Sequence, residues 1–150
     1  MTPEDVRKIV TYCSEEVRRQ GRGPIQVGNM VDAWMYAVDV LDEDSLPNTN
    51  TIIKLGNLVE PTVNSQVRFR NLNVRVGMHI APDFSTVTAK MHRFCDHIED
   101  MTAEEAYFEF EYIHPFQDGN GRVGKIIYNW KLGTLLDPQW PPNKWGISNP

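Results

Sequence analysis

The residues that could carry out a reaction gather in one stretch, positions 114–125, which reads HPFQDGNGRVGK. Gly119, Asn120 and Gly121 form its centre, between two expected helices, and glycine permits positive φ and a close approach of the backbone to a ligand. Consecutive N–H groups in such a turn form an anion-binding nest at the start of the helix that follows. The centre of the stretch is therefore predicted to hold phosphate groups.

The charged and titratable side chains of the same stretch extend this chemistry. Arg122 and Lys125 are predicted to donate hydrogen bonds to phosphate oxygens. Asp118 is a hard oxygen ligand, placed to hold Mg²⁺ beside those phosphates. His114 accepts a proton near neutral pH and is the candidate base, whereas Phe116 has no polar role and is expected in the core. A phosphate cradle, a metal ligand and a base together indicate phosphoryl or nucleotidyl transfer.

A nucleotide-binding P-loop is the competing interpretation, because Gly119, Gly124 and Lys125 match most of that pattern. Two observations count against it. Ile126 stands where the P-loop carries a hydroxyl ligand for Mg²⁺, and the short remainder of the chain leaves no room for further parallel strands. The sequence therefore favours a different phosphate-binding loop.

Helices are predicted wherever apolar residues recur at helical spacing. The predicted segments are residues 3–19, 25–41, 51–59, 82–98, 102–113 and 123–136. In the fifth segment we expect Tyr107, Phe110 and Ile113 to face the core and the charged residues to face solvent. The tail, residues 137–150, is rich in proline and tryptophan and is expected to be irregular.

Residues 67–80 show a different pattern, an alternation of apolar and polar residues that is typical of strands. Val67 and Phe69 precede a polar turn at 71–73, and Val74 and Val76 follow it, which predicts a β-hairpin. Its arginines, which we expect to be solvated, are Arg68, Arg70 and Arg75.

The stretch HPFQDGNGR resembles the signature of Fic-domain proteins, His-x-Phe-x-Asp/Glu-Gly-Asn-Gly-Arg-x-x-Arg. The matching positions are His114, Phe116, Asp118, Gly119, Asn120, Gly121 and Arg122. The segment VRFRNLNVRVGMHIAPDFSTV resembles the hairpin flap of these domains, and the resemblance covers about residues 51–136. It implies an all-α fold, the mainly helical Fic fold, with a small β-hairpin flap near the active site.

The resemblance also implies an activity, because most Fic domains are protein adenylyltransferases that transfer AMP from ATP to a Tyr, Thr or Ser hydroxyl. His114 then resembles the general base, Asp118 the Mg²⁺ ligand and Phe116 the core anchor of the loop. ATP is the implied co-substrate and Mg²⁺ the implied cofactor. A target protein is expected along the flap, about residues 67–80, by strand addition.

The phosphate-binding residues follow from the same resemblance. The α- and β-phosphates are expected at Gly119, Asn120 and Gly121, and the outer phosphates at Arg122.

The chain departs from the signature at the last position, where Lys125 replaces arginine and loses its planar, bidentate fork. In the family this arginine orients the terminal phosphate and, in self-inhibited members, pairs with an inhibitory glutamate. Two alternatives stay open: a Fic-type transferase of phosphate, UMP or phosphocholine, and a degenerate nucleotide-binding or interaction protein. The intact Gly-Asn-Gly favours AMP.

The inhibitory motif of such members, Ser/Thr-x-x-x-Glu-Gly/Asn, has no clear match. The nearest segment runs from Thr11 to Glu16 and lacks the final Gly or Asn. Its ordinary interpretation is a solvated helix face. We therefore expect either a separate inhibitory, antitoxin-like protein or no brake at all.

Composition bounds the remaining possibilities. A length of 150 residues fits a single Fic-like domain, residues 1–150, and the net charge of −5 argues against nucleic acid as a partner. No run approaches the about 18 apolar residues of a membrane span, so no membrane partner is expected. Two cysteines favour a reducing compartment. We expect a cytoplasmic, toxin-like protein of a bacterium or of a phage-infected host cell, and delivery into a host cell is compatible with this.

Overall fold

The computed structural model describes residues 1–41 and 46–142. Within these ranges the chain forms six α-helices, two 3-10 turns and one two-stranded antiparallel sheet. The helices are α1 (Pro3–Arg19), α2 (Pro24–Leu41), α3 (Thr49–Val59), α4 (Val87–His97), α5 (Ala103–Ile113) and α6 (Asn120–Leu132). The 3-10 turns are Phe84–Thr86 and Ile98–Asp100, and the strands are β1 (Arg75–Val76) and β2 (His79–Ile80). The mainly helical fold with a small hairpin is therefore confirmed.

Capping residues explain why the helices begin where they do. Thr2 accepts a hydrogen bond from the Asp5 N–H while the Asp5 carboxylate accepts one from the Thr2 N–H, and this capping box starts α1. Thr102 and Glu105 form the same reciprocal pair at the start of α5. Both boundaries lie within one residue of the predicted ones, because a capping box is a local signal.

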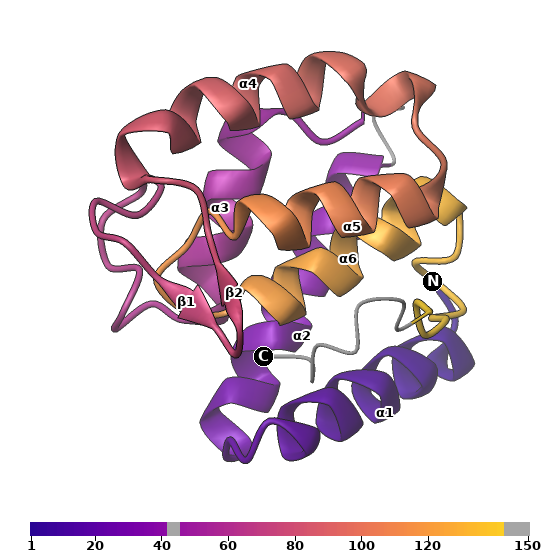
Figure 1. The fold of residues 1–150 in the computed structure, drawn as a ribbon. Helices are drawn as coiled ribbons and strands as arrows, with labels where there is room; N and C mark the ends of the chain where they lie inside the picture. Colours follow the sequence, from indigo (N-terminus) through magenta and orange to yellow (C-terminus); the bar gives the residue numbers. More distant parts are fainter. Residues whose placement is uncertain (42–45, 143–150) are drawn as a thin grey trace.

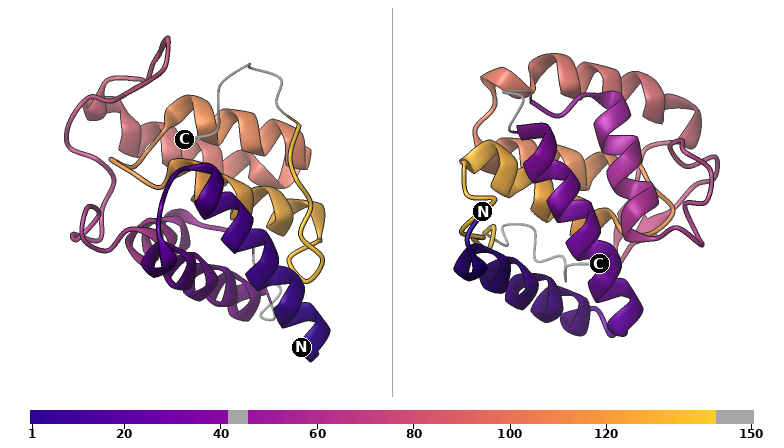
Figure 2. Two further views of the ribbon diagram at one scale, coloured as in Figure 1. Left: turned by 90° about the horizontal axis from the view of Figure 1, so that it is seen from below. Right: turned by 180° about the vertical axis from the view of Figure 1, so that it is seen from behind.

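The helices enclose one core, with α5 and α6 side by side at its centre (Figure 1). Helix α4 crosses one side, α1 lies along the opposite side, and α2 and α3 cover the back, as the view from behind shows (Figure 2). Every helix contributes buried apolar side chains, among them Ile9, Trp34, Leu55, Met91, Phe110 and Ile126. The face of this core at the junction of α5 and α6 positions the loop that carries the signature.

The hairpin is shorter than the alternation of residues predicts, and its turn lies elsewhere. Arg75 pairs with Ile80 and Val76 with His79, so the turn is Gly77–Met78 and not residues 71–73. Gly77 has φ of 58°, a conformation that a two-residue hairpin turn requires and that glycine adopts without strain. Residues 67–73 run without strand structure because Phe69 and Arg70 are drawn into the core.

The described part of the tail, residues 137–142, is irregular, as expected, and residues 143–150 of the predicted tail lie outside the described residues. The Trp140 ring stacks on Tyr12 of α1 at 4.0 Å between centroids, and the Tyr12 hydroxyl donates to the Gln139 carbonyl. These contacts fasten the tail to α1. None of the described helices is long and apolar enough to cross a membrane.

Gly56 provides a test of this packing, because a Cβ at this position of α3 would overlap the ring of Phe116. Gly56→Ala is expected to lower the free energy of unfolding by about 1–3 kcal/mol, the usual cost of overpacking a core. Gly28→Ala is the matched control, since Gly28 lies within α2 with open space around its Cβ. That variant is expected to gain about 0.5–1 kcal/mol. Urea denaturation measures both, and equal changes would contradict the packing described.

Candidate functional site

The signature loop joins the C-terminus of α5 to the N-terminus of α6 and is held closed from within. His114 ends α5 in the left-handed conformation, with φ of 50°, and Gly119 begins α6 with φ of 85°. The Asn120 side chain donates to the Phe116 carbonyl and accepts from the Phe116 N–H, both at 2.8 Å. Phe116 itself is buried between Phe69 and Phe110. The Asn120 side chain is therefore engaged within the loop, and only the backbone of Asn120 is left to bind a ligand.

The N-terminus of α6 has no side-chain cap. Gly119 is the N-cap residue and has no side chain to accept a hydrogen bond from the first turn. The first bond within the helix runs from the Val123 N–H to the Gly119 carbonyl. The backbone donors of residues 120–122 precede that bond, which is the arrangement the nest interpretation expects.

His114 is 6% exposed, and its Nδ1 has no hydrogen-bond partner among the described residues. Burial lowers the pKa of His114 to about 4, and the positive charge of Arg70 acts in the same direction. The imidazole is therefore neutral at pH 7, which is the form that accepts a proton.

Arg70 holds the strained turn at His114 and is not solvated, so that expectation is wrong for this arginine. Its guanidinium donates to the carbonyls of His114 at 2.7 Å, Leu72 at 2.9 Å and Pro82 at 2.6 Å. Its own N–H donates to the Pro115 carbonyl at 2.9 Å. One side chain thus ties the flap to the loop, because a buried guanidinium needs a partner for each donor.

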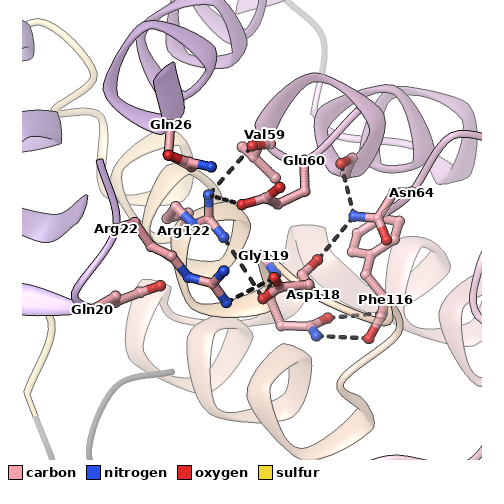
Figure 3. Close-up of polar contacts among 12 residues, drawn as sticks. Gln20, Arg22, Gln26, Val59, Glu60, Asn64, Phe116, Asp118, Gly119 and Arg122 are labelled. Atoms are coloured by element: carbon pink, nitrogen blue, oxygen red, sulfur yellow. Dashed lines mark hydrogen bonds and ion pairs between the residues drawn. The ribbon is translucent and has the colours of Figure 1, made fainter. Parts of the chain in front are cut away.

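Asp118 lies where two arginines meet (Figure 3). Its Oδ2 accepts from Arg22 Nη2 at 2.8 Å, and its Oδ1 accepts from the Gly119 N–H at 2.8 Å. The Asn64 side chain donates to the Asp118 carbonyl and to the Gly56 carbonyl, both at 2.9 Å, and so ties the loop to α3. The carboxylate is 26% exposed and reachable from solvent.

Arg122 has no exposed surface and is bound to the end of α3 (Figure 3). Its Nη1 pairs with Glu60 Oε1 at 3.0 Å and donates to the Val59 carbonyl at 3.3 Å. Its Nη2 lies 3.7 Å from Asp118 Oδ1 and has no hydrogen-bond partner among the described residues. One edge of the guanidinium is therefore committed to structure, and the other faces the loop.

Lys125 is also fully buried, and its ammonium group is 2.9 Å from Glu16 of α1. The Tyr107 ring lies 5.9 Å away. The solvated-face interpretation of residues 11–16 holds for Glu15, which is exposed, and is wrong for Glu16. A phosphate role for Lys125 stays a prediction that requires this pair to open.

Glu111 of α5 also departs from expectation, because a charged residue of this helix was expected to face solvent. Its Oε1 is buried without a hydrogen-bond partner, in a space that a Cβ on Gly124 would fill. Burial raises the pKa of Glu111 to about 7, although the charge of Lys125 opposes this.

The residues present fit a Mg²⁺ ion that is shared with a nucleotide. Among the described residues no three His, Cys, Asp or Glu side chains come together to hold a metal. Mg²⁺ is often bound by only one or two carboxylates plus substrate phosphates, and Asp118 offers one accessible carboxylate beside the uncapped end of α6.

Five polar residues of the site could not be predicted from local patterns, and each reaches it from another part of the chain. They are Glu16, Arg22, Glu60, Asn64 and Arg70. No local signal identified them. The burial of Arg122 and Lys125, which would require carboxylates from elsewhere, became visible only in the structure.

Comparison with known proteins places this geometry in a family. The family model described as Fic/DOC family matches residues 41–132. Protein adenylyltransferase Fic of Drosophila erecta is 36% identical in an alignment of 83 residues, and the match covers 49% of this chain and 16% of that protein. The protein of the same name from Culex quinquefasciatus is 29% identical in an alignment of 117 residues, and the match covers 65% of this chain and 22% of the relative. The chain therefore spans less than a quarter of the length of these two relatives.

A solved structure shares the fold over most of the chain. The crystal structure of a Fic family protein from Desulfovibrio desulfuricans G20 matches with a TM-score of 0.66. The match covers 90% of this chain and 52% of that one at 20% sequence identity, so the likeness concerns the fold alone.

The buried pair of Glu16 and Lys125 predicts a large effect on stability. Glu16→Gln leaves a buried ammonium group without its counter-charge and is expected to lower the free energy of unfolding by about 3 kcal/mol. Glu15→Gln removes the same charge from the exposed neighbouring position and is expected to change it by less than about 0.5 kcal/mol. Similar losses in both variants, measured by urea denaturation, would show that the pair does not hold α1 on α6.

The buried carboxyl of Glu111 predicts a pH dependence of stability. Its pKa is raised from 4.5 to about 7 on folding, so the native state binds the proton more tightly in this interval. The free energy of unfolding is then expected to fall by about 3 kcal/mol as the pH rises from 4.5 to 7. Glu111→Gln should remove this fall, whereas Glu109→Gln, at an exposed position of α5, should retain it. A fall that persists in Glu111→Gln assigns the effect to another group.

Proposed function

Because the chain belongs to the Fic/DOC family, we propose that it is a protein adenylyltransferase, which transfers AMP from ATP to a Tyr, Thr or Ser hydroxyl of a target protein. The observation that carries the proposal is the loop itself. A neutral, buried His114 stands at one end of it and the uncapped N-terminus of α6 at the other, with the accessible carboxylate of Asp118 between them in the chain.

In the proposed reaction His114 takes the proton of the target hydroxyl. The hydroxyl oxygen forms a bond to the α-phosphorus of ATP as the bond from that phosphorus to the bridging oxygen breaks, and pyrophosphate leaves. The N–H groups of the first turn of α6 and the free edge of Arg122 would bind the phosphate oxygens whose charge rises. Asp118 would hold Mg²⁺, which supplies charge neutralisation at the phosphates when bound.

The flap supports a target bound by strand addition. In the described chain β1 and β2 pair only with each other, so each leaves one edge without a neighbouring strand. His79 of β2 is within 3.0 Å of the Tyr112 carbonyl, and Arg70 joins the preceding segment to the His114 carbonyl. A strand added to this hairpin would therefore lie close to the loop, and backbone pairing would place few demands on the target sequence.

The Glu16–Lys125 pair favours a second candidate function, nucleotide binding without transfer. The position that orients the terminal phosphate in the family is here a lysine that Glu16 neutralises in a buried site. Such a chain would bind Mg-ATP and modify nothing.

Labelling of a host-cell lysate with ATP tests the proposal. With ATP labelled at the α-phosphate, the wild-type chain is expected to label a protein band. His114→Ala is expected to reduce the labelling rate by at least about 100-fold, because a general base contributes about 10²–10⁴. Asp118→Ala is expected to remove the labelling together with its dependence on Mg²⁺, because it removes the carboxylate that would hold the ion. His97→Ala, at an exposed position of α4, is the matched control and should label at the wild-type rate.

The position of the label separates the candidates. Label transferred only from the γ-phosphate would show that the chain transfers phosphate and not AMP. Retained binding of Mg-ATP with no label from either position would support the second candidate. Labelling by His114→Ala at the wild-type rate would falsify the mechanism.

A further inference from the structure

Arg22, in the turn between α1 and α2, forms an ion pair with the signature loop. Its Nη2 lies 2.8 Å from Asp118 Oδ2 (Figure 3). Its side chain remains 42% exposed, and its own N–H donates to the Val17 carbonyl at 3.0 Å. The backbone at this position is thus anchored, whereas the guanidinium is held at a solvent-accessible place by an ion pair.

The two cations that the signature offers to outer phosphates are largely committed elsewhere. Lys125 has no exposed surface and pairs with Glu16. Arg122 has none either, and its Nη1 is taken by Glu60 and the Val59 carbonyl. Neither presents a whole cationic group to a ligand in this conformation.

Two independent features mark a candidate anion site beside Asp118. The first is the N-terminus of α6, where Gly119 provides no side-chain cap. The second is the Nη2 of Arg122, a fully buried donor without a hydrogen-bond partner that faces the loop 3.7 Å from Asp118 Oδ1. An anion at this place would meet donors from Arg122, from the backbone and from Arg22.

We propose that Arg22 binds an outer phosphate of the nucleotide and so replaces the arginine that is missing from the end of the signature. The identity of the anion rests on the proposed function. In the proposed function the Asp118 carboxylate binds Mg²⁺ and is then no longer available to pair with Arg22. The nearest anion left for the Arg22 guanidinium is a phosphate of the nucleotide. Arginine suits this role because its planar fork binds phosphate through two parallel hydrogen bonds, which Lys125 does not offer.

The glycines on either side of Arg22 favour a movement of its side chain from the Asp118 carboxylate to a phosphate. Gly21 has φ of 69° and Gly23 precedes α2, so Arg22 is the only bulky side chain of the turn Gly21–Gly23. The Arg22 side chain is 42% exposed, so solvent rather than packed protein borders part of it. The guanidinium can therefore turn from the carboxylate to a phosphate beside it.

Calorimetric titration with ATP and with AMP, both in MgCl₂, tests this role without relying on catalysis. Arg22→Ala is expected to bind ATP about 10-fold more weakly than the wild type, the effect of one charge-assisted contact, and AMP within about twofold. Arg22→Lys should fall between the two for ATP, because it keeps the charge and loses the fork. Arg18→Ala, an exposed arginine in the last turn of α1, should leave both affinities unchanged.

Two results would overturn the inference. One is wild-type affinity for ATP in Arg22→Ala, and the other is an equal loss for ATP and AMP, which a merely structural effect would produce. Thermal unfolding of Arg22→Ala should remain close to wild type, because a partly exposed ion pair contributes little to stability. A chain that binds ATP through Arg22 and labels no protein would contradict the proposed function and leave this inference standing.

Discussion

Two buried cations on α6 are the constraint on which the rest of the structure depends. Burying a charged group lowers the free energy of unfolding by several kcal/mol unless an opposite charge and further hydrogen bonds accompany it. Arg122 therefore requires Glu60 at the end of α3, and Lys125 requires Glu16 on α1. These two pairs set where α1 and α3 lie around α6, and the apolar core fills the space between them.

The signature loop is held in the same manner, by polar side chains that bond to backbone groups. Asn120 closes it, Asn64 ties it to α3, and Arg70 ties its strained start to the flap. His114 adopts a left-handed conformation that is unfavourable for a side-chain-bearing residue, and such a conformation persists where the surroundings hold it. The backbone of the loop is consequently held in one conformation before any ligand binds.

This arrangement gives charged residues of the signature a structural task as well as a chemical one. Arg122 uses one edge of its guanidinium to join α3 and keeps the other toward the loop. Lys125 lies wholly inside, where the substitution of lysine for arginine places a compact ammonium group against Glu16. The accessible cation at the loop is then Arg22, which comes from a different segment of the chain.

The sequence by itself determined the helices, since caps such as Thr2 with Asp5 and the periodicity of apolar residues act over a few positions. It also determined the family and the residue types of the loop, because the signature is contiguous. The prediction placed the hairpin turn at residues 71–73, whereas the structure has it at Gly77–Met78. The prediction failed because the alternation of apolar residues did not reveal that Arg70 is buried. Only the tertiary structure decided the partners Glu16, Arg22 and Glu60. The pairs with Arg22 and Glu60 join residues 96 and 62 positions apart, and an ion pair between distant segments leaves no periodic mark in either of them.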